Sequence, residues 1–220
     1  MKGEFKNDLE FEDRCKKAAD NIYRKLGATE IRRWDYQNKE GKDKQLEDID
    51  VTIATKNRAY NASEKFDASG EFKVSEKFRT SDYGDMLIEI KNHPIGDKQN
   101  LKDSWGFESK ADYYMYFVPG VLHEISTKPL KNYLNDHKKE LEKLVNDFIS
   151  SPKYDANIKI RGKHVEGIKF DNKNCSLISC KSYNESNKQE WMSISICIPW
   201  KNINSITTHK EIKVDYTGKY

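Results

Sequence analysis

The stretch VSEKFRTSDYGDMLIEIK, residues 74–91, decides the fold that this sequence indicates. It covers most of two segments, 71–79 and 85–93, and the turn-forming run 80–84 that joins them. In both segments apolar residues alternate with charged ones. Such alternation is typical of half-buried β-strands. Each segment carries a carboxylate and a lysine among its apolar residues, so the charge on these two consecutive strands requires an explanation.

Two amphipathic helices are expected on either side of these strands. Residues 8–26 place apolar side chains at helical spacing, with Asp8 as the N-cap and Gly27 as the stop. Residues 130–149 carry a second apolar stripe, and Pro152 follows its end. Because an apolar stripe must be buried against another element, we expect both helices to flank a central sheet.

The composition of further segments favours strands, since β-branched and aromatic residues are enriched between Gly, Asn and Ser clusters. In residues 47–55 apolar and acidic residues alternate, so one face of this expected strand is acidic. The polar runs 35–46 and 56–70 are expected to be loops. The remaining expected strands are 28–34, 113–118, 157–162, 165–170, 175–183 and 191–198.

Length and composition indicate one domain of the α/β class. At 220 residues and 25.8 kDa, a second full domain would leave both halves small. We expect a central mixed β-sheet flanked by helices, with residues 1–152 as the core and residues 153–220 as an antiparallel, β-rich C-terminal elaboration of the same domain. With 36% hydrophobic and 34% charged residues, much of the chain is expected to be surface.

Charge and hydropathy exclude few classes of function. Lys and Arg number 39 against 36 Asp and Glu, and the resulting net charge of +3 does not by itself imply nucleic-acid binding. The amino terminus has no apolar signal segment, and the longest apolar stretch, 113–122, contains Pro119 and Gly120 and is too short to span a bilayer. We therefore expect a cytoplasmic protein without a membrane partner.

The four cysteines indicate buried thiols. They form no CxxC pair and do not lie at spacings typical of zinc sites, which argues against both a disulfide framework and a zinc centre. They are Cys15, Cys175, Cys180 and Cys197.

Carboxylates and lysines on strands suit the metal-dependent hydrolysis of phosphodiester bonds. Carboxylates hold a divalent cation against a phosphate oxygen, and a nearby cationic side chain stabilises the developing negative charge. Side chains at positions i and i+2 of a strand share one face, so a sheet fixes the separation between such groups.

The order of these residues resembles the PD-(D/E)xK, or restriction-endonuclease-like, superfamily of nucleases, and small phage or mobile-element proteins most of all. The resemblance covers residues 11–149 and implies a restriction-endonuclease-like fold and an endonuclease that uses Mg²⁺ or Mn²⁺ to cut nucleic acid, with DNA as the expected substrate. The motifs that carry it are DIDV (48–51), VSEKFR (74–79), GDMLIE (84–89) and SWGF with KADYYMY (104–116).

The resemblance assigns roles to individual residues. Asp50 corresponds to the metal-binding aspartate, and Lys77 to the lysine that orients or activates the attacking water and stabilises the transition state. The family's glutamate position falls on Ser75, and a serine hydroxyl is a poor ligand for a hard cation.

Three other carboxylates could complete the metal site. We favour Glu89, because its strand is expected to lie adjacent to the strand of Lys77. Glu76 would serve if its strand is bulged or twisted, and Glu12 would have to reach from the first helix. An alternative register makes Glu89 and Lys91 the Glu-x-Lys motif and leaves Lys77 in support.

Two other functions stay open at this stage. A chain that lost its carboxylate at Ser75 would be a catalytically inactive nuclease fold that binds nucleic acid or protein, and a structural or regulatory protein would have no nucleic-acid role. Cutting both strands of a duplex would favour a homodimer. Lysines of the 130–149 helix could contact phosphates, as could Lys98, Lys102 and Lys110, although a solvated helix face is the simpler explanation.

Overall fold

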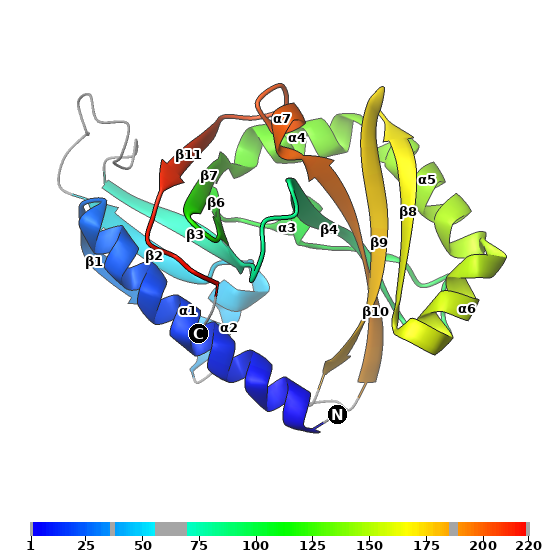
Figure 1. The fold of residues 1–220 in the computed structure, drawn as a ribbon, viewed down its shortest axis with the longest axis horizontal. Helices are drawn as coiled ribbons and strands as arrows, with labels where there is room; N and C mark the ends of the chain where they lie inside the picture. The colour runs from blue at the N-terminus through cyan, green and yellow to red at the C-terminus, as the bar shows by residue number, and fades with distance from the viewer. Residues whose placement is uncertain (1, 36–37, 56–69, 185–188, 219–220) are drawn as a thin grey trace. The chain divides into compact units, whose positions relative to one another are not determined.

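The computed structural model describes residues 2–35, 38–55, 70–184 and 189–218 (Figure 1). The chain forms two compact units, each built from segments that are separate in sequence. Unit 1 comprises Met1–Tyr83, Lys110–Thr127 and Thr208–Tyr220, and unit 2 comprises Gly84–Ser109 and Lys128–Thr207. Each unit has its own sheet, and the α/β class expected from the sequence is confirmed. The loop expected at 56–70 lies, except for its last residue, outside the described residues.

Unit 1 contains a mixed six-stranded sheet. Its strands follow the order β1-β2-β3-β6-β7-β11, and every neighbouring pair is antiparallel except β3 and β6, which are parallel. A parallel pair needs a long crossover connection, and residues 79–112 supply it. The strands are β1 (Ala28–Arg33), β2 (Val51–Thr55), β3 (Gly70–Phe78), β6 (Tyr113–Val118), β7 (Val121–Ser126) and β11 (His209–Lys213).

One face of this sheet packs against the long helix α1 (Lys2–Lys25), which runs alongside β1 in Figure 1. The buried core between them includes Tyr23 of α1, Val74 of β3 and Phe117 of β6. Helical residues precede Asp8, so this residue is not the N-cap that the sequence suggested. The apolar stripe expected in residues 8–26 is confirmed as the packing face.

A second helix of unit 1, α2 (Lys39–Leu46), occupies a run that we expected to be a loop. The side chain of Asn38 caps it by accepting a hydrogen bond from the Gly41 amide at 2.7 Å. Gly41 is buried against the chain before it, because a Cβ there would lie 2.0 Å from the carbonyl oxygen of Asp35. The helix therefore depends on a cap and a close approach, and not on an apolar stripe.

Unit 2 contains an antiparallel five-stranded sheet in the order β5-β4-β10-β9-β8. Its strands are β4 (Asp85–Pro94), β5 (Lys102–Asp103), β8 (Lys163–Phe170), β9 (Lys173–Asn184) and β10 (Gln189–Pro199). Its helices are α3 (Trp105–Glu108), α4 (Thr127–Asp136), α5 (Lys138–Ser150), α6 (Pro152–Arg161) and α7 (Trp200–Ile203). The first residue of α4, Thr127, is assigned to unit 1.

Two expectations for the middle of the chain are wrong. The single helix expected at 130–149 is divided into α4 and α5, because the backbone of His137 leaves the helical region with φ −103° and ψ 14°. Residues 157–161 belong to α6 and not to a strand: Ser151 caps that helix, Pro152 opens it, and Gly162 ends it with φ 67°.

The strands β3 and β4, consecutive in sequence, belong to different sheets. β3 lies between β2 and β6, whereas β4 pairs with β5 and β10, so the expectation that these strands adjoin each other is wrong. The C-terminal strands β8, β9 and β10 form an antiparallel arrangement as expected, but they pair with β4, and β11 returns to the sheet of unit 1. Neither unit coincides with residues 1–152 or 153–220.

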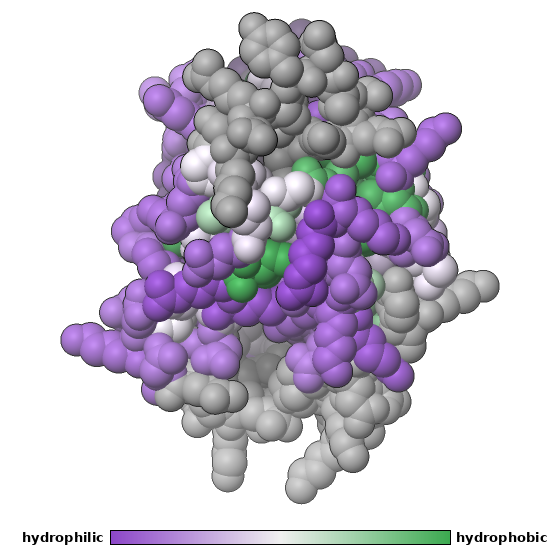
Figure 2. All heavy atoms as spheres, turned by 90° about the vertical axis from the view of Figure 1, so that its left-hand side faces the viewer, coloured by the Kyte–Doolittle hydropathy of each residue, from purple (hydrophilic) through white to green (hydrophobic). Residues whose placement is uncertain are grey.

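Hydrophilic side chains dominate the face drawn in Figure 2, and smaller hydrophobic areas lie between them. No helix among the described residues is long and apolar enough to cross a membrane. The four cysteines are free thiols, and three of them are buried, as the sequence indicated.

Candidate active site on the unit 1 sheet

Alternation along β3 divides the candidate residues between the two faces of the unit 1 sheet. Val74 and Glu76 point toward α1, since Val74 belongs to the core and Glu76 accepts a hydrogen bond from Tyr23 of that helix. Ser75 and Lys77 therefore point to the opposite face. β3 pairs with β2 and β6 without a register shift, so this alternation holds along the strand.

Glu76 is held in a buried ion-pair network on the α1 side. The Arg33 guanidinium donates to its two oxygens at 2.6 and 3.2 Å, and the Tyr23 hydroxyl donates to one of them at 2.7 Å. Burial raises the pKa of Glu76, while Arg33 acts in the opposite direction. β3 pairs with both neighbours without a register shift and so is not bulged, and the role of Glu76 as a metal ligand stays a prediction.

Lys77 forms an ion pair with Asp48 on the other face. Its Nζ lies 3.0 Å from Asp48 Oδ1, and both side chains are largely buried. Burial alone would lower the pKa of Lys77, but the carboxylates of Asp48 and Asp50 outweigh it and raise that pKa. Lys77 is therefore a cation at neutral pH, positioned between two acidic side chains.

Asp50 lies immediately before β2 and is fixed to the neighbouring strand. Its amide donates to the carbonyl of Val74 at 2.9 Å, and its Oδ2 accepts the amide of Glu76 at 2.7 Å. Gln45 of α2 donates to Oδ1 at 3.3 Å. A carboxylate has about four acceptor positions, so these bonds orient Asp50 and leave lone pairs for a cation.

Ser75 lies fully buried on β3, one position from the strand residue that bonds Asp50. Among the described residues its hydroxyl has no hydrogen-bond partner. A buried polar atom without a partner costs about 1–3 kcal/mol, so native structures keep such atoms where something else satisfies them. The oxygen of this hydroxyl is thus a candidate metal ligand on the sheet face that also carries Asp48 and Asp50.

The other carboxylates proposed to complete the site belong to other elements. Glu89 lies on β4 in unit 2, where the Ser104 hydroxyl donates to it, and its role as a metal ligand stays a prediction. Lys91, its partner in the alternative register, pairs with Asp103 at 2.6 Å. Glu12 lies on α1 and pairs with Lys16 at 2.7 Å, so it lies on the side of the sheet that α1 covers.

Several lysines considered for phosphate contacts have partners within their own unit. Lys110 pairs with Glu47 at 2.8 Å, Lys98 with Asp155 at 2.6 Å, and Lys138 with Asp103 at 2.6 Å. Contact of these lysines with nucleic acid stays a prediction, and it would require exchange of these ion pairs.

A row of polar side chains continues from Lys77 across the sheet. Strand pairing places Lys77 opposite Tyr116, Tyr116 opposite His123, and His123 opposite Glu211. Residues directly opposite each other in a ladder point to the same face. His209, two residues before Glu211, joins this face as well.

Sequence reasoning did not assign the partners of three residues on this face. In the sequence, Asp48 and Asp50 are both candidates for the metal-binding aspartate, and Asp50 is the one we favour, yet Asp48 is the side chain that pairs with Lys77. Its backbone has φ 57°, a left-handed conformation that regular alternation does not predict. His123 and His209 are 86 residues apart, and only the His-x-Glu spacing at 209–211 offered a signal.

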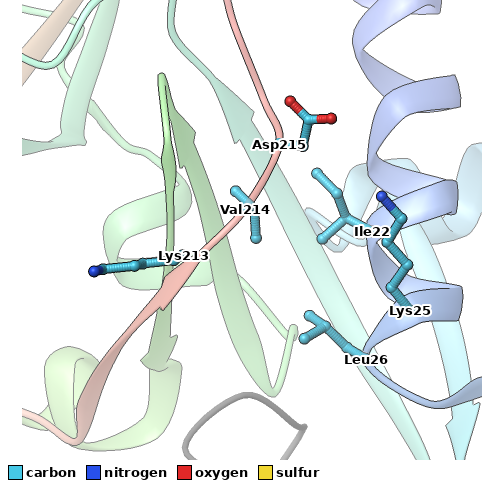
Figure 3. A pocket seen from close by; sticks show the side chains of 6 residues that line it. All are labelled: Ile22, Lys25, Leu26, Lys213, Val214 and Asp215. Atoms are coloured by element: carbon cyan, nitrogen blue, oxygen red, sulfur yellow. The ribbon is translucent and has the colours of Figure 1, made fainter.

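A pocket on the other side of the sheet is separate from these residues. α1 supplies Ile22 and Lys25, Leu26 follows directly after that helix, and the end of β11 supplies Lys213 and the residues after it (Figure 3). Figure 3 shows Lys213 extending away from α1. Among the lining residues Asp215 is a lone carboxylate, whereas the face with Lys77 carries Asp48 and Asp50.

Comparison of the chain with protein-family models, with curated proteins and with solved structures found no match. The candidate site therefore rests on the residues and their geometry.

Proposed function

We propose that this chain is a divalent-metal-dependent nuclease that hydrolyses phosphodiester bonds in DNA, with unit 1 as a restriction-endonuclease-like catalytic unit. The observation that carries the proposal is that Asp50, immediately before β2, is bonded to β3, the strand of Lys77, and that Asp48 is paired to Lys77. An acidic side chain on one strand and a lysine on the next is the arrangement that the family resemblance implies.

The oxygen donors on this face fit Mg²⁺ or Mn²⁺. Mg²⁺ in phosphate-processing sites is bound through one or two carboxylates together with waters and substrate phosphates. Asp50 supplies one carboxylate, Asp48 a second, and the buried hydroxyl of Ser75 a neutral oxygen. The absence of a carboxylate at Ser75 is therefore compatible with this kind of site.

The chain's own residues would act by orientation and charge. Bound at Asp50, Mg²⁺ or Mn²⁺ would supply a Lewis acid for a phosphate oxygen. Lys77, kept cationic by Asp48 and Asp50, stabilises the negative charge that develops as water attacks phosphorus. The bond to the leaving oxygen then breaks, and that oxygen takes up a proton.

The second candidate function is a catalytically inactive module of the same fold that binds nucleic acid. The serine at position 75 favours it, because a buried hydroxyl replaces the carboxylate expected there. Both functions predict DNA binding that weakens steeply with salt, since phosphate contacts release counterions. They differ only in cleavage.

A cleavage assay distinguishes the two functions. Supercoiled plasmid, linear duplex and single-stranded DNA are incubated with Mg²⁺, Mn²⁺ or EDTA, and the products are separated by size. The proposal expects metal-dependent cleavage that Asp50→Asn reduces by at least about 100-fold.

Asp20→Asn is the matched control, because Asp20 is also ion-paired, at 2.8 Å from Arg33, but lies on the α1 side of the sheet. Cleavage that both variants reduce equally would argue against a site at Asp50. A folded protein that binds DNA and cuts none of the substrates with either metal would favour the inactive module.

A further inference from the structure

Two neighbouring strands of unit 1 bring three metal-ligand side chains together. β7 contributes His123, and the edge strand β11 contributes His209 and Glu211. Pairing of Glu211 with His123 sets the two strands in register, and the two-residue spacing places His209 on the same face. Of the described residues, only these three form a group of His, Cys, Asp or Glu whose donor atoms could hold one ion.

The donor atoms are close enough to share one cation. His123 Nδ1 lies 2.9 Å from His209 Nε2, and 3.9 Å from Glu211 Oε1. All three ligand atoms lie within 4.8 Å of one another. Metal–nitrogen and metal–oxygen bonds of about 2.0–2.2 Å separate neighbouring ligand atoms by roughly 3 Å, so small side-chain rotations suffice.

The protonation of the two imidazoles also suits a metal. Burial and the neighbouring His209 lower the pKa of His123 to about 4, and burial lowers the pKa of His209. A neutral imidazole is the form that ligates metals, and burial favours that form in both rings.

We propose that His123, His209 and Glu211 form a binding site for Zn²⁺ that is separate from the Asp50 site. Two imidazoles and one carboxylate suit zinc, whereas Mg²⁺ prefers oxygen ligands alone. The inference does not depend on the nuclease proposal, since none of its three ligands belongs to the Asp50 and Lys77 pair.

Such an ion would tie β11 to the sheet. β11 has five residues and lies at the sheet edge, where strands have one neighbour only. A cation between β7 and β11 would link segments that are 86 residues apart in the chain. Three protein ligands would leave a fourth position for water, as in zinc sites that bind or activate a small molecule.

The test is a Zn²⁺ titration of the full chain by isothermal titration calorimetry near neutral pH. Wild type should bind one Zn²⁺ per chain, and excess Mg²⁺ should not displace it. His209→Ala and Glu211→Gln should each weaken Zn²⁺ binding by at least about 100-fold. Residues that only hydrogen-bond to a metal ligand already cost about 10–100-fold in metal affinity when they are changed, so the loss of a ligand should cost at least as much.

Glu166→Gln provides a matched control. His164 and Glu166 repeat the His-x-Glu spacing on β8, with His164 Nε2 3.5 Å from Glu166 Oε2, but the described residues near them include no second histidine ligand. Glu166→Gln should therefore leave the Zn²⁺ affinity unchanged. Glu211 is 60% exposed, so Glu211→Gln removes a ligand without opening the core.

Hydrogen exchange supplies a second readout. Zn²⁺ should slow amide exchange in residues 209–213 of the wild type and of Glu166→Gln, but not of Glu211→Gln. Failure of the wild type to bind Zn²⁺, or equal affinity in wild type, His209→Ala and Glu211→Gln, would overturn the proposal. A wild-type protein that binds Zn²⁺ but cuts no DNA would contradict the nuclease proposal and leave the Zn²⁺ proposal standing.

Discussion

At the scale of single residues, the hydroxyl of Ser75, which we propose as a metal ligand, has no hydrogen-bond partner among the described residues. We predict that Ser75→Ala, measured by urea unfolding in EDTA, changes the free energy of unfolding by less than about 1 kcal/mol, because no hydrogen bond is lost. Thr52→Val is the contrast: the Thr52 hydroxyl accepts the Trp34 indole N–H at 2.8 Å, and losing that acceptor should cost about 1–3 kcal/mol. Equal losses in the two variants would show that Ser75 has a structural partner.

Two consecutive arginines differ in the charge that each one neutralises. Arg33 holds the buried carboxylate of Glu76, so Arg33→Ala should lower the free energy of unfolding by about 3–5 kcal/mol. Arg32, 58% exposed and 3.3 Å from Glu40, is the control, and Arg32→Ala should cost less than about 1 kcal/mol. Chemical denaturation of both variants measures the difference. Similar losses would mean that the Glu76 network does not stabilise the fold.

At the scale of elements, α2 depends on the small size of Gly41. Gly41→Ala should destabilise the protein by about 1–3 kcal/mol, since its Cβ would lie 2.0 Å from the Asp35 carbonyl oxygen and the chain would have to move. Gly167→Ala on β8 is the control, because its Cβ would meet nothing within 4 Å. Thermal unfolding of both variants compares them, and an unchanged melting temperature for Gly41→Ala would contradict the close approach.

An acid-sensitive ion pair joins α5 to the strands of unit 2. Burial opposes ionisation of Asp103, but hydrogen bonds from Lys138 and Lys91, both 2.6 Å, lower its pKa below 3.8. A carboxyl with a lowered pKa in the folded state stabilises the fold above pH 3.8, and this contribution disappears as the pH falls below that value.

Asp103→Asn should therefore be less stable than wild type near neutral pH, and the difference should narrow below pH 3.8. Urea unfolding at several pH values measures it. A difference that stays constant with pH would mean that the two lysines do not lower the pKa of Asp103.

Elements with strong local signals could be predicted from the sequence. The apolar stripe of α1 and the alternation in β3 and β4 were sufficient to place these elements. The helix α2 was not predicted, because a cap and one glycine contact stabilise it. Pairing of β3 with β6, and not with β4, depends on contacts distant in sequence that periodicity does not encode.

The same distinction applies to the candidate site. Asp50 and Lys77 could be named from motif order, whereas the ion pair between Asp48 and Lys77 joins residues 29 apart through a left-handed backbone position. The meeting of His123 with His209 requires the return of the C-terminal strand to unit 1, which the sequence did not indicate.

At the scale of the whole molecule, the chain passes between its two units several times, and each unit keeps its own sheet. The proposed catalytic residues Asp48, Asp50, Ser75 and Lys77 all belong to unit 1, as does the proposed zinc site. The account therefore assigns both metal-dependent properties to one sheet.

The most direct test of the central claim is the initial rate of DNA cleavage in Mg²⁺ by wild type, Lys77→Met and Lys16→Met. Lys16 also forms an ion pair, with Glu12 at 2.7 Å, but on the α1 side. The account predicts metal-dependent cleavage by wild type and Lys16→Met, and a rate at least about 100-fold lower for Lys77→Met with its fold intact. Equal rates in all three proteins, or no cleavage by folded wild type, would contradict it.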